Sequence, residues 1–140
     1  MAIQFFFAEK AIIVPERKRL KIFITDLFKR ECKIFTSLLF IFCSDEYLLN
    51  INRRFLQHDY YTDIITFNLS SNPETIEGEI YISIDRIKDN ASVIKVSNNF
   101  ELHRVIFHGI LHLCGYMDKS ESEKSIMTAL EDACLAKYFF

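Results

Sequence analysis

Two histidines and an aspartate in the last third of the chain have the types and the spacing of a metal-binding site. His108 and His112 stand four residues apart inside an apolar run that is typical of a helix. Because side chains at i and i+4 lie on the same helix face, both imidazoles can point at one ion. Gly115 is expected to end that helix in a left-handed conformation, after which the chain can reverse and return Asp118 to the same point.

A site made of His108, His112 and Asp118 is typical of a catalytic metal. Three protein ligands leave the fourth position of a tetrahedral zinc to water, whereas four protein ligands close a structural site. Bound zinc lowers the pKa of that water and polarises a phosphoryl or carbonyl oxygen. We therefore predict one zinc ion, with other divalent metals as alternatives, since a carboxylate ligand makes a site more tolerant of manganese or magnesium. The competing interpretation is that both histidines are hydrogen-bonded core residues that bind no metal.

The residue after the first histidine argues against a zinc peptidase of the H-E-x-x-H type. In those enzymes it is a glutamate that acts as general base, whereas here it is Gly109. A glycine inside a helix indicates close approach of backbone or ligand, or simple helix packing. The sequence identifies no other general base, so the catalytic residues stay unassigned. His103 is expected outside the metal ligands because it lies well round the helix from His108, and His58 is expected in a loop.

Four β-prone segments combined with helical ones predict an α+β fold. Segment 34–43 is apolar on both alternations, which is typical of a central strand. Segment 78–84 alternates apolar with polar residues, which indicates a half-exposed strand and suits an edge. The other two strands are predicted at 3–7 and 64–67.

Apolar residues at helical spacing fill most of the remaining chain. Helices are expected after Pro15, after Ser44 and after Ser120, and a short one from Ile87 to Ile94. The histidine helix is expected to begin at Asn98, which with Glu101 resembles a capping box. The second helix is expected to bury Leu48, Ile51 and Phe55, and the histidine helix to bury Leu102, Val105, Ile106, Ile110 and Leu113. We therefore expect a single four-stranded mixed sheet with helices packed on it, one of them a zincin-like metal helix, in one domain over residues 1–140.

The composition indicates a globular protein with a sizeable core. Half of the 140 residues are hydrophobic and only three are glycine, which excludes a disordered chain. No apolar run is long enough for a membrane helix, and no signal peptide is expected. The four cysteines form no C-x-x-C pair, which predicts reduced core thiols and a cytoplasmic location. A net charge of −2 does not indicate a nucleic-acid partner, so cations that bind RNA would have to be local.

The stretch from His108 to Asp118 resembles the H-G-x-L-H-L-x-G-Y-D-H signature of the YbeY family. These bacterial ribosomal-RNA maturation factors are regarded as metal-dependent single-strand endoribonucleases. Three weaker segments are similar in the same order. Thr62–Phe67 resembles a P-T-D-V-L-S-F strand, Gly78–Ile80 a G-D-I strand, and Met127 with Glu131 an M-x-x-x-E pattern in the last helix.

Two departures from the family pattern concern the metal and the substrate. Asp118 stands where the family usually has a third metal-binding histidine, and aspartate remains a competent zinc ligand. Leu56 stands where the family has an arginine that is thought to hold RNA phosphate. Arg53 and Arg54, about one helical turn earlier, are therefore the RNA-binding candidates, with an inert surface pair as the alternative.

The resemblance implies a metal-dependent single-strand endoribonuclease that acts in ribosomal RNA maturation and ribosome assembly. Its partners would be ribosomal RNA and the small ribosomal subunit, with no membrane, and the sequence does not predict an oligomeric state. The alternative is a non-catalytic ribosome-assembly factor in which the metal holds the fold together. A weaker third option is a metallohydrolase of a small substrate.

Overall fold

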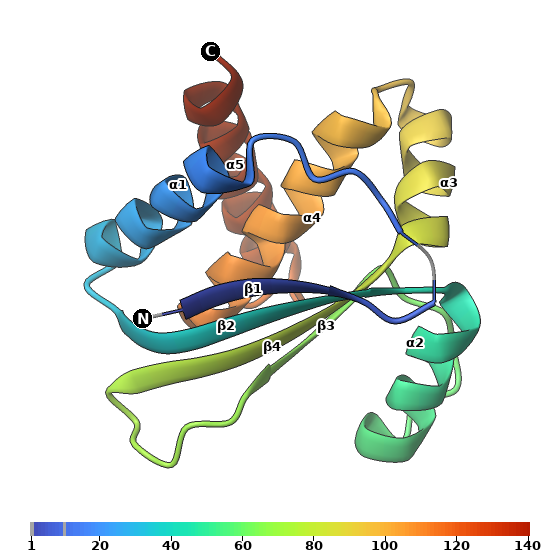
Figure 1. The fold of residues 1–140 in the computed structure, drawn as a ribbon, viewed down its shortest axis with the longest axis horizontal. Helices are drawn as coiled ribbons and strands as arrows, with labels where there is room; N and C mark the ends of the chain where they lie inside the picture. Colours follow the sequence, from blue (N-terminus) through green and yellow to red (C-terminus); the bar gives the residue numbers. More distant parts are fainter. Residues whose placement is uncertain (1, 10) are drawn as a thin grey trace.

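Within residues 2–9 and 11–140, which the computed structural model describes, one mixed sheet of four strands has the order β1-β2-β4-β3 (Figure 1). Met1 and Lys10 of the predicted domain lie outside the described residues. The strands are β1 (Ala2–Phe7), β2 (Ile34–Cys43), β3 (Ile64–Asn68) and β4 (Thr75–Ser83). β2 runs parallel to both β1 and β4, and β3 pairs antiparallel with β4. The predicted α+β fold with its mixed sheet and the central position of 34–43 are confirmed.

The expectation of an edge position for segment 78–84 is wrong. β4 lies between β2 and β3 and is paired with both. Its alternation arises because its two faces differ: Ile80 and Ile82 are buried, whereas Glu77 is exposed and Glu79 is half-buried. The alternation of apolar and polar residues therefore indicates that one face of this strand is open to water. It does not indicate that the strand has an unpaired edge.

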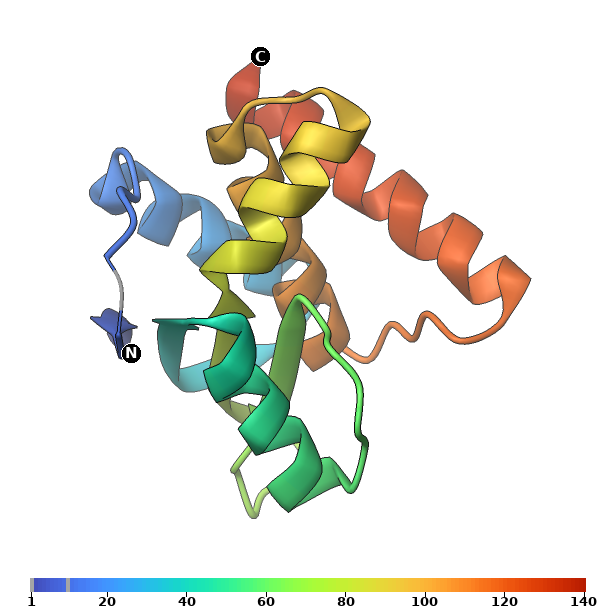
Figure 2. The same cartoon turned by 90° about the vertical axis from the view of Figure 1, so that its right-hand side faces the viewer.

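Helices lie on both sides of the sheet. α1 (Arg17–Arg30), α4 (Asn98–Leu113) and α5 (Glu121–Phe139) share one side, and α2 (Asp45–Ile51) lies on the other (Figure 1). α3 (Ile84–Ile94) follows β4 directly and packs against α4. The view in Figure 2 again shows α2 apart from the other helices. In the described part of the chain, no helix combines the length and the apolar composition that crossing a membrane requires.

The main hydrophobic core fills the space between the sheet and α4. The predicted stripe of α4 is buried at Leu102, Val105, Ile106 and Ile110, and Leu113 packs against it half-buried. The sheet contributes Leu38, Phe40, Phe42, Ile80 and Ile82. Since burying one such side chain contributes about 1.5–3 kcal/mol, this contact fixes how α4 lies on the sheet.

Serine hydroxyls begin several of the helices. Ser44 accepts from the backbone N–H of Tyr47, as its N-cap position predicts. Ser120 and Glu123 form a capping box at the start of α5. The N-cap of α4 is Ser97, so the prediction of Asn98 is wrong by one residue.

The prediction that Phe55 belongs to the buried stripe of the second helix is wrong. α2 continues into a π-helical segment, η1 (Asn52–Leu56), and 61% of Phe55 is exposed. A π-helical turn holds more residues than an α-helical turn, so it rotates the following side chains away from the 3.6-residue stripe. Leu48 remains buried, in a small cluster with Cys43 and Ile65.

The four cysteines are free thiols. Cys43, Cys114 and Cys134 are buried, as predicted, whereas Cys32 is exposed in the turn after α1. Burial raises the pKa of Cys43 and Cys114 to about 12, so both stay protonated at neutral pH. The expectation of a core position is wrong only for Cys32. This residue lies in the turn between α1 and β2, whereas the apolar residues near it in the sequence belong to those two elements.

Gly109 lies where α4 comes closest to the sheet. A Cβ atom at this position would lie 2.8 Å from Cδ1 of Ile64 and 3.3 Å from Cγ2 of Ile80. These are contacts of helix against strand, so helix packing explains the glycine. The missing side chain lets α4 settle on β3 and β4 immediately beside His108.

Replacing Gly109 with valine is expected to lower the free energy of unfolding by about 1–3 kcal/mol, because its methyl groups must displace Ile64 and Ile80. Alanine is expected to cost less, since the Cδ1 end of Ile64 can rotate away and alanine favours the helix by about 1 kcal/mol. Urea unfolding of the three proteins measures both effects. A valine variant as stable as the wild type would contradict the close approach.

Candidate metal centre

His108 and His112 project from the last two turns of α4, and the turn that ends the helix brings Asp118 toward them. Gly115 has a φ of 107°, the left-handed region that the sequence predicted. Its N–H donates to the carbonyl of His112 at 2.9 Å, and the N–H of Tyr116 donates to the carbonyl of Leu111 at 3.1 Å. These two bonds form a Schellman motif, which reverses the chain immediately after the helix.

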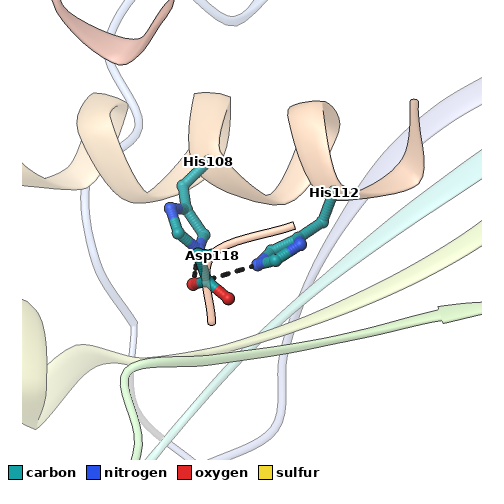
Figure 3. A group of neighbouring side chains, drawn as sticks. All are labelled: His108, His112 and Asp118. Carbon is teal, nitrogen blue, oxygen red and sulfur yellow. Dashed lines mark ion pairs between the residues drawn. The ribbon is translucent and has the colours of Figure 1, made fainter. Parts of the chain in front are cut away.

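The three side chains converge on one point (Figure 3). Oδ2 of Asp118 lies 3.3 Å from Nε2 of His108 and 3.4 Å from Nε2 of His112. All three atoms lie within 4.8 Å of one another and could hold a metal ion. Metal–ligand bonds of about 2.0–2.2 Å place neighbouring corners of a tetrahedron about 3.3–3.6 Å apart. The two nitrogen–oxygen separations therefore fit two edges of a tetrahedral site.

The second nitrogen of each ring fixes which nitrogen is free to bind. Nδ1 of His112 lies 2.9 Å from the carbonyl oxygen of Tyr116. A carbonyl only accepts, so Nδ1 carries the proton and the neutral ring keeps its lone pair on Nε2. Nδ1 of His108 donates in the same way to Oε2 of Glu131 at 2.5 Å. In its neutral form each ring thus presents an unprotonated Nε2 toward Asp118, as metal binding requires.

Glu131 belongs to a cluster of charged side chains beneath His108. The carboxylate is nearly fully buried on α5, and its other oxygen accepts from Arg104 at 3.1 Å. Arg104 also donates to the fully buried Glu101 at 2.8 Å and lies 3.7 Å from Asp63. The guanidinium thereby links α4, α5 and the start of β3 at the base of the candidate site.

The charges of this cluster act on the first histidine. Burial alone lowers the pKa of His108, but the hydrogen bond and charge of Glu131, with the charges of Asp63 and Asp118, outweigh burial and raise it. Burial raises the pKa of Asp63, and the His108 and Arg104 charges offset this only in part. The surroundings of His108 therefore favour a positive charge on or beside its ring, whether that charge is a proton or a metal ion.

The centre is open on one side, with 38% of the Asp118 side chain exposed. A groove of about 370 Å³ begins at His112 and is lined among others by Leu56, His58, Tyr60, Met117 and Lys119. His58 lies in the loop before β3, as predicted. Leu56, which stands in place of the family's arginine, thus lines the groove with an uncharged side chain. The positive charge in the lining comes from Lys119, the residue after Asp118.

Arg53 and Arg54, the RNA-binding candidates, lie outside this groove lining. Nε of Arg53 contacts Oδ1 of Asp59 at 2.5 Å, and the guanidinium of Arg54 lies 5.7 Å from the ring centre of Phe55. Both arginines are exposed on η1. The structure brings the three metal-ligand candidates together, and neither arginine belongs to that group or to the groove lining.

His103 is a core residue away from the candidate ligands. It is buried, its ring stacks on Tyr138 with centres 5.0 Å apart, and its Nδ1 donates to the carbonyl of Asn99 at 2.7 Å. The sequence expected His103 outside the metal ligands, and its position agrees. Sequence reasoning missed the role of Glu131, for which only the M-x-x-x-E pattern gave a signal.

The sequence model of the endoribonuclease YbeY family matches residues 8–139. The chain belongs to this family. It is 50% identical to an endoribonuclease YbeY of Cytophaga hutchinsonii over 133 residues, which cover 94% of this chain and 93% of that protein. It is 43% identical to an endoribonuclease YbeY of Porphyromonas gingivalis over 131 residues, covering 93% and 86%.

A solved structure has the same fold as this YbeY family member. The solution structure of TM1509 from Thermotoga maritima superposes with a TM-score of 0.62 and 25% sequence identity, over 98% of this chain and 89% of that one. The arrangement of one sheet with helices on it is thus shared with an experimentally determined protein.

Glu131→Gln is expected to weaken zinc binding by about 10- to 100-fold, as the loss of other partners of metal-bound histidines does. Both Arg104 and Nδ1–H of His108 require an acceptor, and an amide offers only one oxygen to the two donors. The measurement is competition for zinc with a chelating dye. Asp132→Asn removes the same charge from the exposed neighbour on α5 and serves as the control. Equal affinities for the two variants would contradict the role of Glu131.

His103 is expected to make the protein less stable in acid. Burial lowers its pKa, against a smaller opposing effect of its hydrogen bond to Asn99. The unfolded chain therefore binds a proton near pH 6.5 that the folded protein does not, and the free energy of unfolding decreases below that pH. His103→Phe keeps an aromatic ring and removes the titration, so the free energy of unfolding of the wild type relative to that of the variant should fall from pH 7.5 to pH 5.5 in urea unfolding. A difference that is independent of pH would refute this assignment.

Proposed function

We propose that this protein is a metal-dependent single-strand endoribonuclease that acts in ribosomal RNA maturation and ribosome assembly in the cytoplasm. The observation that carries the proposal is the convergence of His108, His112 and Asp118 within 4.8 Å in a member of the endoribonuclease YbeY family. The relatives from Cytophaga hutchinsonii and Porphyromonas gingivalis carry the same name, which supports RNA as the substrate. The proposed partners are ribosomal RNA and the small ribosomal subunit, and the proposed unit is one metallohydrolase domain over residues 1–140.

Zinc is the ion that we propose for the three ligands, with manganese or magnesium as alternatives. Two imidazole nitrogens and one carboxylate oxygen are a common donor set for catalytic zinc. When bound, such an ion supplies an acidified water and polarises a phosphoryl oxygen. α4 then serves as the proposed zincin-like metal helix, although Gly109 in place of a glutamate gives it no general base.

The chain's own residues hold the site in one arrangement. Glu131 and the carbonyl of Tyr116 keep both Nδ1 atoms protonated, so that the two Nε2 atoms stay available. The Schellman turn holds Asp118 opposite the rings. Arg53 and Arg54 remain the proposed RNA-binding residues on the exposed surface of η1, where they would contact phosphates beyond the metal centre.

The three-ligand set speaks against an assembly factor whose metal is only structural. Structural zinc sites are closed by four protein ligands. Here the group within 4.8 Å has three members among the described residues, and 38% of the Asp118 side chain is exposed. An ion held in this way keeps a position open toward solvent, which suits a reaction more than a fold-stabilising role.

Wild-type protein with added zinc is expected to cleave single-stranded RNA, and EDTA is expected to stop the cleavage reversibly. His112→Ala and Asp118→Asn each remove a ligand atom. They should therefore reduce the rate by more than the 10- to 100-fold that loss of an outer partner typically costs. The measurement is the initial rate of cleavage of a labelled unstructured oligoribonucleotide.

Asp132→Asn is the control for the loss of an acidic charge, since this residue lies exposed on α5. Melting temperatures separate loss of chemistry from loss of fold. If His112→Ala cleaved as fast as the wild type, the metal centre would not be the site of reaction. If it lost its folded structure as well as its activity, the structural-metal alternative would be favoured.

A further inference from the structure

We propose that the groove beside Asp118 binds one unpaired nucleotide, with its base on the ring pair of His58 and Tyr60 and its phosphate at Lys119. The inference rests on the proposed function, which makes RNA the substrate. It assigns to that substrate three residues that lie outside the metal ligands. The groove begins at His112, so a nucleotide in it lies next to the metal centre.

His58 and Tyr60 form a preassembled aromatic platform. Their ring centres lie 5.1 Å apart with an angle of 20° between the planes, and the hydroxyl of Tyr60 lies 2.9 Å from Nδ1 of His58. The loop that carries them is anchored from below, because the buried Asn52 donates from Nδ2 to the carbonyl of Tyr60 at 2.9 Å. With 56% of Tyr60 exposed, the pair is available to a ligand. Proteins that bind single strands stack bases on such faces.

Lys119 supplies the charge that a phosphate needs. Among the described residues that line the groove, none is acidic, and Lys119 takes part in none of the ion pairs of residues 2–9 and 11–140. Arg53 differs, since Asp59 lies 2.5 Å from its guanidinium. An unpaired lysine directly after Asp118 thus places a cation at the mouth of the metal centre.

The rest of the lining suits the flat body of a base. Leu56 and Met117 contribute apolar surface, and Thr62 and Thr66 also line the groove. An aromatic platform, an apolar wall and one cation are the features that hold a single nucleotide, whereas a double helix would require a row of cations. The geometry therefore favours an unpaired RNA segment over a duplex.

The test measures RNA binding separately from cleavage. Fluorescence anisotropy follows a labelled single-stranded oligoribonucleotide, with the protein as purified and again with EDTA, where the RNA stays intact. Tyr60→Ala is expected to weaken binding about tenfold, as removal of one stacking partner does. Lys119→Gln is expected to lower the slope of log Kd against log salt by about 0.7, the contribution of one phosphate contact in a single strand.

A second probe separates the base from the backbone. An abasic sugar-phosphate strand of the same length lacks the rings that would stack. Tyr60→Ala should leave its affinity unchanged, whereas Lys119→Gln should weaken it. Tyr60→Phe keeps the ring, so its binding of the RNA probe should stay within about twofold of the wild type.

Matched controls come from neighbouring residues of the same type. Tyr61 is exposed to 52%, and its hydroxyl donates to Glu46 at 2.5 Å. Lys124 pairs with Glu121 at 3.9 Å. Neither lines the groove, so Tyr61→Ala and Lys124→Gln should bind RNA as the wild type does.

The inference is overturned if Tyr60→Ala and Lys119→Gln bind RNA as their controls do while the wild type still cleaves it. That result would leave the proposed function intact and move the substrate to another surface. If the wild type neither bound nor cleaved single-stranded RNA, the proposed function would fail together with the inference. If the wild type bound duplex RNA as tightly as single strands, the unpaired nucleotide would be rejected.

Discussion

α4 has to satisfy two demands at once, because one stripe must be buried in the core while the half-buried His108 and His112 stay within reach of a metal ion. Gly109 faces the sheet and Ile110 is buried in the core, whereas His108 and His112 are half-buried and meet Asp118 next to the groove that β3 lines. The helix can therefore neither rotate nor slide without losing the core or the ligand geometry. The glycine lets the helix sit close to β3, which sets the height of both rings above the edge of the sheet.

A second constraint is the buried charge beneath the first ring. Burying carboxylates is costly unless each finds a partner, and Arg104 bonds to both Glu101 and Glu131. Replacing such a cluster with apolar residues often stabilises a protein, so stability alone does not explain its presence. Its position does, since Glu131 also holds Nδ1 of His108. Through Glu131, α5 therefore fixes the orientation of the His108 ring, one of the metal-ligand candidates.

Local features of the metal centre could be predicted from the sequence, and features that depend on tertiary contacts could not. The spacing of His108, His112, Gly115 and Asp118 predicts a helix followed by a reversal, and both are present. Glu131 is 23 residues from His108 in the chain, and no periodicity relates the two. The sequence also could not show that β4 lies inside the sheet, because its alternation of apolar and polar residues indicates only which face is exposed to solvent. The exposed position of Phe55 depends on a π-helical turn, which apolar periodicity does not reveal.

The place of β3 in the sheet has a consequence for the shape of the substrate. As the last strand in the order, β3 puts the groove that begins at His112 at a margin of the sheet. A polymer that passes such a margin can continue beyond it in both directions. A centre at the bottom of a blind channel would accept only the terminus of a chain. The position of β3 therefore suits a cut made within a strand, far from either of its ends.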